Sequence, residues 1–300
     1  MLPSSFSKQQ KYLLILALLF IVLWSALFIQ SENPFAKLQE FGAFFLLGIG
    51  GAITANSTGA GGGVVFVPSF DALGMAIEQV IATSFAIQCF GMTVGSISWL
   101  IFFNSHDKQK IERVNLLYQA LACSVPFSIL GIVCVQYMPI IPIASIDLIF
   151  SIFSLVFGLI VLYHCVYLGK RSTHRGVTLL TNKEKALIAI TSILGGIITG
   201  WISVGVGEIL AVILLLRGFS VMFSVAAGVI VTATTVVAGI SYFIQAQLIH
   251  LDVLMFAAPG AIIGAFVARF IAQALGAKRL KLFLGSWILF VGLVGLLDFI

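Results

Sequence analysis

Charged side chains are too scarce along this chain to cover a folded surface that faces water. Only 9% of the 300 residues are charged, while 60% are apolar; about 25% of the residues in an ordinary soluble domain are charged. The chain is therefore predicted to be a polytopic membrane protein, with a lipid bilayer as its solvent. This composition excludes a soluble enzyme, a nucleic-acid-binding protein and a disulfide-bonded scaffold. The net charge of +5 is attributed to membrane topology.

Seven apolar stretches have the length of a membrane-spanning helix, which needs about 20 residues to cross the hydrocarbon core. They are 12–29, 79–103, 115–136, 147–168, 220–246, 252–275 and 282–299. The first follows two lysines, as a secretory signal does, but it is longer than the typical apolar signal region of about 7–15 residues. Its end also lacks a small-x-small cleavage pattern, so we expect it to be a retained helix.

The basic residues define the orientation of these helices. Fourteen of the 16 Lys and Arg residues fall in the N-terminus, in loops 104–114, 169–185 and 276–281, and at Arg217. Because short cytoplasmic loops are enriched in Lys and Arg, these segments are assigned to the cytoplasm. The N-terminus is then cytoplasmic, the C-terminus lies on the opposite side, and a bacterial-type inner membrane is the expected location.

Two further apolar stretches, 40–73 and 186–216, are too long for one span and have glycine-rich centres. With the orientation above, the first begins and ends outside, and the second begins and ends in the cytoplasm. Each is predicted to be a re-entrant hairpin of two half-helices. Irregular backbone is not tolerated against lipid, so both hairpin tips are expected to lie inside the protein.

The two hairpins divide the chain into two similar halves of opposite orientation, because each precedes three predicted spans. Both tips share the spacing GG-x2-T-x3-[ST], which begins at Gly50 in one and at Gly195 in the other. The predicted fold is all-α, with seven spanning helices, two re-entrant broken-helix hairpins and an inverted-topology repeat. The predicted domains are 1–39, the N-terminus with an additional helix; 40–168, the first repeat; 169–185, a cytoplasmic linker; and 186–300, the second, inverted repeat.

Inverted repeats with broken helices are typical of secondary transporters, which bind their substrate where the broken helices meet. The glycines of 59–63 precede a half-helix, where free N–H groups and the helix dipole favour an anion. No Lys or Arg lies near either tip, so a small anion would be held by N–H groups and neutral side chains. The candidate substrate-binding residues are Asn56, Ser57, Thr58, Gly59, Gly61, Gly62, Gly63, Thr83, Ser84, Gln88, Ser203, Gly205, Gly207 and Thr232.

Glu208 is the most conspicuous single residue, because an acidic side chain inside an apolar segment costs about 2.5–3.5 kcal/mol and should face a cavity. One hypothesis makes it the carrier of a coupling proton, so that H⁺ is the coupling ion. The other makes it a structural cap, since a carboxylate at a helix N-terminus accepts hydrogen bonds from free N–H groups. The sequence leaves both hypotheses open.

No cofactor and no metal site are predicted, because the four cysteines and four histidines form no CxxC or Cys/His spacing. An intramembrane enzyme is not expected either, since no two acidic residues sit together in a span. The alternatives to a carrier of this kind are an anion channel lined by the same hairpins, or a carrier of another small organic anion such as a carboxylate. The oligomeric state cannot be predicted from the sequence.

Three motifs connect the chain with a known family. They are the glycine-rich run from Gly59 to Pro68 (GAGGGVVFVP), the helix that opens Ala82-Thr83-Ser84, and a second copy that begins at Gly195 and continues through Gly205-Val-Gly207. By these motifs the chain resembles the sulfite exporter TauE/SafE family of membrane permeases over roughly 40–299. The resemblance implies transport of sulfur-containing anions such as sulfite or organosulfonates, with 56–63 and 203–207 lining the site. The second tip departs from the family pattern at Glu208.

Overall fold

The computed structural model describes residues 22–104, 108–138, 145–163, 165 and 180–297, and the regular structure in these ranges is helical, with no strand. The chain divides into two units, Met1–Ala43 and Phe44–Ile300, which are considered separately. The first unit contains a helix at 22–30 and the short helix α2 (Pro34–Phe41). Most of the predicted helix 12–29 lies outside the described residues.

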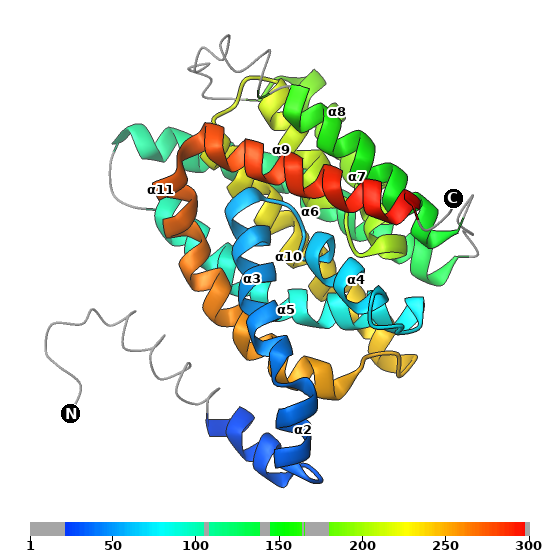
Figure 1. The fold of residues 1–300 in the computed structure, drawn as a ribbon. Helices are drawn as coiled ribbons and strands as arrows, with labels where there is room; N and C mark the ends of the chain where they lie inside the picture. Colours follow the sequence, from blue (N-terminus) through cyan, green and yellow to red (C-terminus); the bar gives the residue numbers. More distant parts are fainter. Residues whose placement is uncertain (1–21, 105–107, 139–144, 164, 166–179, 298–300) are drawn as a thin grey trace, which may run out of the picture. The chain divides into compact units, whose positions relative to one another are not determined.

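The second unit carries the helices that follow (Figure 1). They are α3 (Ala43–Thr58), α4 (Gly63–Asp71), α5 (Ile77–Phe103), α6 (Lys108–Tyr137), α7 (Ile146–Tyr163), α8 (Asn182–Ile202), α9 (Val206–Leu216), α10 (Val221–Gln245) and α11 (Leu251–Leu297). Helix α11 is broken at Gly276, whose φ of 71° and ψ of 166° are not helical. It therefore consists of two segments, joined at a residue without a Cβ that tolerates positive φ.

Six helices of the described chain are long and apolar enough to cross a membrane, or up to seven if α2 and α3 count together as one bent span. Five of the six coincide with the predicted spans 79–103, 115–136, 147–168, 220–246 and 252–275. The predicted span 282–299 contains only the shorter apolar helix Gly285–Leu297. The prediction of a multi-pass helical protein is confirmed, whereas the predicted set of seven spans is not.

Helix α8 differs from the half-helix predicted at its position, because its 21 residues have the length of a full span. Thr181 and Glu184 form a capping box that starts the helix ahead of the apolar run. Gly195 and Gly196 stay helical, and the backbone of neighbouring segments packs directly on both. The glycine pair therefore marks close packing rather than the end of a helix, and the break comes later, at Ser203.

The helices on either side of each break fold back on each other. Phe44, at the start of α3, contacts Phe70 near the end of α4, with ring centroids 5.7 Å apart. Arg217, which follows α9, donates a hydrogen bond to Glu184 in the first turn of α8 at 3.3 Å. The start and the end of each helix pair thus lie close together, as a helical hairpin requires. That both ends face the same side of a membrane stays a prediction.

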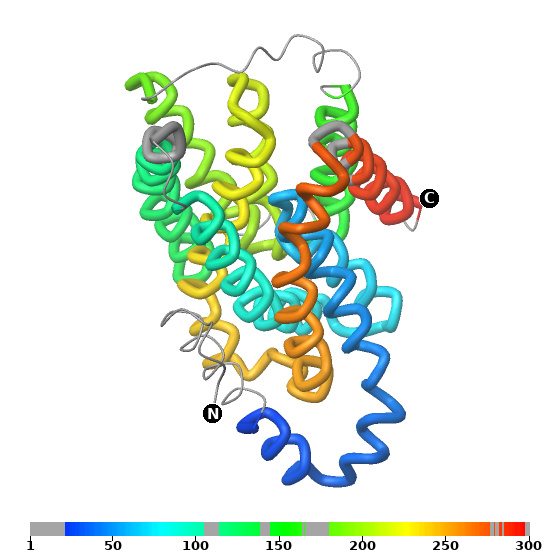
Figure 2. The backbone as a smooth tube through the Cα atoms, turned by 90° about the vertical axis from the view of Figure 1, so that its left-hand side faces the viewer, coloured from blue at the N-terminus to red at the C-terminus, as the bar shows by residue number. Residues whose placement is uncertain are grey.

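Glycines bring the leading helix of each hairpin against a helix of the other half. Helix α3 lies against the first segment of α11, where a Cβ on Gly48 would strike the carbonyl oxygen of Ala257. Helix α8 lies against α6, where a Cβ on Gly131 would strike the carbonyl oxygen of Ile193. Small residues permit such close backbone approach between membrane helices. Figures 1 and 2 show the orange segment of α11 beside the blue α3.

The packing partners are exchanged between the two halves. Helix α5 packs against α11 and α10 packs against α6; α4 packs against α5 and α9 against α10, while α5 and α10 pack against each other. Two inverted copies of one structural unit would produce this reciprocal pattern. The domain boundaries at 40–168 and 186–300 stay predictions, and most of the linker 169–185 lies outside the described residues.

Candidate functional site

One carboxylate links the two hairpin tips. The first tip (59–62) joins α3 to α4, and the second tip (203–205) joins α8 to α9. The Gly61 N–H donates a hydrogen bond to Oε1 of Glu208 at 2.6 Å, and the Gly205 N–H donates one to Oε2 at 2.9 Å. Glu208 is only 1% exposed. Its carboxylate is therefore held by backbone donors from both halves of the chain.

Gln88 of α5 makes the second link between the tips. Its Oε1 accepts a hydrogen bond from the Gly62 N–H at 2.9 Å, and its Nε2 donates to the Ser203 hydroxyl at 2.9 Å. The Ser203 hydroxyl in turn donates to Oγ of Ser84 at 2.9 Å, and all of these side chains are buried. A primary amide suits this position because it offers an acceptor to one tip and donors to the other.

The close approach of the tips requires glycine at several positions. Gly59 has a φ of +83° and Gly205 a φ of +146°, in regions that residues with a Cβ rarely adopt. A Cβ on Gly63 would strike the carbonyl oxygen of Ser203, and a Cβ on Gly207 would lie 2.7 Å from the carbonyl oxygen of Gly59. The predicted tip glycines therefore set the distance between the two tips.

Three predicted polar residues at the end of α3 form hydrogen bonds within their own helix. Asn56 Nδ2 donates to the Ala52 carbonyl oxygen at 2.9 Å. The hydroxyls of Ser57 and Thr58 both donate to the Thr54 carbonyl oxygen, at 3.3 and 2.6 Å. These side chains lie next to the first tip, but their donors are engaged locally, and their part in substrate binding stays a prediction.

The two predicted threonines outside the hairpins differ in placement. Oγ1 of Thr83 accepts a hydrogen bond from the His250 N–H at 2.9 Å, so it bonds to the residue before α11 rather than to either tip. Thr232 of α10 lies against the tips, since a Cβ on Gly207 would strike its hydroxyl and a Cβ on Gly61 would lie 3.6 Å from its methyl group. Its buried hydroxyl has no hydrogen-bond partner in the part of the chain that the structure describes.

Two residues of the junction were not predicted from the sequence. Oγ1 of Thr199 accepts a hydrogen bond from the Val206 N–H at 2.9 Å and so satisfies a free donor of the first turn of α9. Nε1 of Trp99 donates to the carbonyl oxygen of Asn56 at 2.9 Å and holds the end of α3 against α5. The GG-x2-T spacing places Thr199 near the tip and could have indicated it, whereas no sequence signal points to Trp99.

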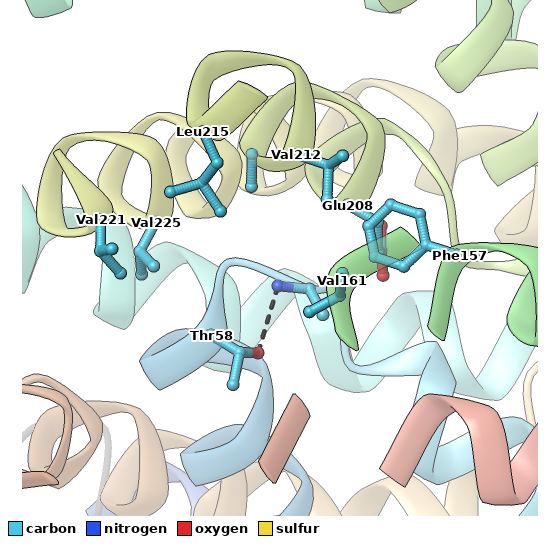
Figure 3. A pocket seen from close by; sticks show the side chains of 10 residues that line it. Thr58, Phe157, Val161, Glu208, Val212, Leu215, Val221 and Val225 are labelled. Atoms are coloured by element: carbon cyan, nitrogen blue, oxygen red, sulfur yellow. Dashed lines mark hydrogen bonds between the residues drawn. The ribbon is translucent and has the colours of Figure 1, made fainter. Parts of the chain in front are cut away.

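A small cavity borders Glu208 between the first tip, α7, α9 and α10 (Figure 3). Thr58 and Glu208 supply the polar side chains among its ten lining residues, and the Thr58 hydroxyl accepts a hydrogen bond from the Ala60 N–H at 3.3 Å. The other lining residues are Ala60, Phe157, Val161, Ala211, Val212, Leu215, Val221 and Val225. The carboxylate thus has backbone donors on one side and an apolar space on the other.

Glu208 is also isolated from other charges along the helices that surround it. Helices α3 and α10 contain no Asp, Glu, Lys, Arg or His. The remaining charged residues of α4, α5, α7 and α8 lie in their first or last turns: Asp71, Glu78, Asp147, Lys183, Glu184 and Lys185. Any anion at the tips would therefore be held by N–H groups and neutral donors, and Glu208 provides negative charge there.

Six described helices long and apolar enough to span a membrane, together with a buried polar junction between two helical hairpins, define a multi-pass membrane protein. The family model of the sulfite exporter TauE/SafE matches residues 44–294, so this chain belongs to that family, as the sequence motifs indicate. Its members are membrane transporters of sulfite-type anions and not enzymes. No curated protein sequence and no solved structure matches the chain.

Proposed function

We propose that this protein is a secondary transporter that binds sulfite or an organosulfonate between the two hairpin tips and carries it across the membrane by alternating access. The observation that carries the proposal is the pair of N–H groups, one from each tip, that converge on the two oxygens of one carboxylate. A junction that holds one small oxyanion without a Lys or Arg has the chemistry to hold another. Neutral donors also bind an anion loosely enough for it to leave again.

The exchanged packing partners of the two halves support alternating access. If the two hairpins are related by a two-fold axis in the membrane plane, the two halves can exchange conformations. One conformational state then opens the tips to one side of the membrane, and the exchanged state opens them to the other. In this proposal both hairpins are re-entrant, the N-terminus is cytoplasmic, and the C-terminus lies across a bacterial-type inner membrane. This orientation is tested by introducing single cysteines near Lys37 and near Arg217, which are assigned to opposite sides of the membrane. A membrane-impermeant thiol reagent should label each of them from its own side only.

The substrate is tested by flux into proteoliposomes that contain the purified protein. Sulfite, sulfate, an organosulfonate and a carboxylate are compared, with and without a pH gradient. We expect saturable uptake of sulfite or the sulfonate that exceeds uptake of sulfate. No saturable flux of any sulfur oxyanion would refute the proposed substrate class.

The same proteoliposomes also test two alternative functions of this site. An anion channel would pass substrate without acceleration by unlabelled substrate on the opposite side, whereas a carrier shows counterflow. A carrier of carboxylates is favoured by one specific observation, which is that the group now held between the tips is itself a carboxylate. Preferential, saturable uptake of the carboxylate would support that alternative.

A further inference from the structure

The N–H groups best placed to bind an anion are already occupied by Glu208. The Gly61 and Gly205 N–H groups donate to its two oxygens at 2.6 and 2.9 Å. Each donor lies at or beside the N-terminal end of a short helix, α4 or α9, where partial positive charge favours an anion. A substrate anion between the tips would therefore need the donors that Glu208 now uses.

A carboxylate is a close chemical stand-in for a sulfur oxyanion. Its two oxygens accept one N–H group each, and sulfite or a sulfonate offers a similar pair of oxygens on one central atom. The third oxygen of a sulfonate would need a further donor. The hydroxyl of Thr232 meets that need, because it is buried beside Gly207, belongs to a side chain whose methyl group faces Gly61, and has no hydrogen-bond partner among the described ranges of the chain. A buried polar group without a partner requires an explanation, and a ligand at the tips provides one.

The cavity beside Glu208 provides an alternative position for its side chain. Apart from the Thr58 hydroxyl, the walls of this cavity are apolar. A charged carboxylate that moved there would give up its two N–H donors for walls that offer almost none, which costs far more than the same move by a neutral, protonated carboxyl group. Movement of the side chain from the tips into the cavity therefore favours the protonated form of Glu208.

Within the described ranges, Glu208 is the titratable group at this cavity: no other titratable side chain lines it or forms a hydrogen bond with Glu208. The titratable groups on the surrounding helices α3–α5 and α7–α10, or directly after α9, are Asp71, Glu78, Cys89, Asp147, Tyr163, Lys183, Glu184, Lys185, Arg217 and Tyr242.

We infer that the Glu208 carboxylate is a tethered anion that the substrate displaces: the side chain leaves the tips in its protonated form, and the substrate oxyanion takes over the N–H groups of Gly61 and Gly205. This inference rests on the proposed function. One proton is taken up by a Glu208 oxygen for each anion bound, so the site holds one negative charge whether it is empty or loaded. Glu208 is then a structural cap when it is ionised and bound to the tips, and a proton carrier when it is protonated and displaced.

The test uses the purified full-length protein and ethanesulfonate, which stays a monoanion throughout the neutral pH range. Its affinity and the number of protons taken up on binding are measured by calorimetry in buffers of different ionisation enthalpy. For the wild type we expect one proton per sulfonate, and an affinity that falls about tenfold for each unit of pH increase while Glu208 of the free protein is ionised. The Glu208→Gln variant should bind without proton uptake and with no such dependence on pH.

Glu184→Gln is the matched control, because Glu184 is also buried but lies at the far end of α8, paired with Arg217. It should retain the proton uptake and the pH dependence of the wild type. Binding by the wild type without proton uptake would overturn the inference, even if Glu208→Gln does not fold, and so would a Glu208→Gln variant with the wild-type pH dependence. Failure of the wild type to bind any sulfur oxyanion at any pH would instead refute the proposed function.

Discussion

The two hairpin tips share a backbone plan but differ in what they contribute to hydrogen bonding. The first tip presents the N–H groups of Gly61 and Gly62 and has no acidic residue, whereas the second tip leads into Glu208. If both tips lacked an acidic residue, the Gly61 and Gly205 N–H groups would lose the acceptor that they share. Glu208, which belongs to the second hairpin alone, supplies that acceptor, so the two hairpins differ in a residue that joins them.

The largest effect is expected where each tip leaves no space for a Cβ, as at Gly63 in the first hairpin and Gly207 in the second. Gly63→Ala would strike the carbonyl oxygen of Ser203, and Gly207→Ala would strike the Thr232 hydroxyl. Overpacking of this kind costs about 1–3 kcal/mol. Because the clash lies where the tips meet, we expect this cost to fall on the arrangement that binds substrate, where it corresponds to roughly a tenfold loss of affinity or more. Proteoliposome flux should fall for both variants, since the tips are expected to be equally intolerant.

Gly50→Ala is the control for both glycine variants. Gly50 lies in α3 and a Cβ there would meet nothing within 4 Å, so transport should stay at the wild-type level. If one tip accepted alanine without loss while the other did not, the equivalence of the two tips would be wrong.

A smaller effect is expected from the amide that joins the tips. Gln88→Leu would leave the Gly62 N–H without its acceptor, and the Ser203 hydroxyl would keep only its hydrogen bond to Ser84. Burial of an unsatisfied polar group costs about 1–3 kcal/mol, so the midpoint of thermal unfolding should fall by several degrees. Gln245→Leu, at the exposed end of α10, provides the comparison. An unchanged midpoint for Gln88→Leu would show that this link contributes little to the junction.

The hydroxyl of Thr232 is expected to affect the affinity for a sulfonate more than the affinity for a carboxylate. Thr232→Val removes a donor but keeps the shape of the side chain, so binding of a sulfonate should weaken by roughly tenfold. Binding of a carboxylate, which has no third oxygen, should change less. Thr234→Val serves as its control, because the Thr234 hydroxyl donates to carbonyl groups of its own helix at 2.9 and 3.1 Å. Equal weakening of both ligands would place the Thr232 hydroxyl outside the anion site.

The smallest effect is expected far from the tips, where an ion pair between Arg217 and Glu184 joins the two ends of the second hairpin. Arg217 has a side chain that is 45% exposed, and water screens such a pair. Arg217→Gln should therefore change the free energy of unfolding by less than about 1 kcal/mol. Chemical denaturation in detergent measures this difference. A loss of several kcal/mol would mean that the ion pair, and not the tips, determines the stability of the second hairpin.

Much of the fold could be predicted from hydropathy and charge alone. Residue patterns that depend only on local sequence indicate five spans, the breaks between the helices of each hairpin, and the glycine-rich character of the tips. Helix α8 could not be predicted at its full length, because Gly195 and Gly196 stay helical through contacts with distant segments. A glycine pair has the same appearance in sequence whether it ends a helix or lets another backbone approach it.

The sequence predicted the main residues of the candidate site but not the hydrogen bonds between them. Glycine spacing indicated the tips, and an isolated acid in an apolar segment indicated Glu208. The pairing of Glu208 with Gly61 joins residues 147 positions apart, which no local pattern specifies. For the same reason the contact of Thr83 with His250 and the support of Asn56 by Trp99 could not be foreseen.

The position of a bound anion tests the central claim most directly. A structure of the protein with bromomethanesulfonate, located by the anomalous signal of bromine, would place the anion without reference to its shape. We expect the sulfonate oxygens at the N–H groups of Gly61 and Gly205, with the Glu208 side chain turned into the adjacent cavity. A bromine peak away from both tips, with Glu208 still bonded to Gly61 and Gly205, would contradict an anion site at the junction of the two hairpins.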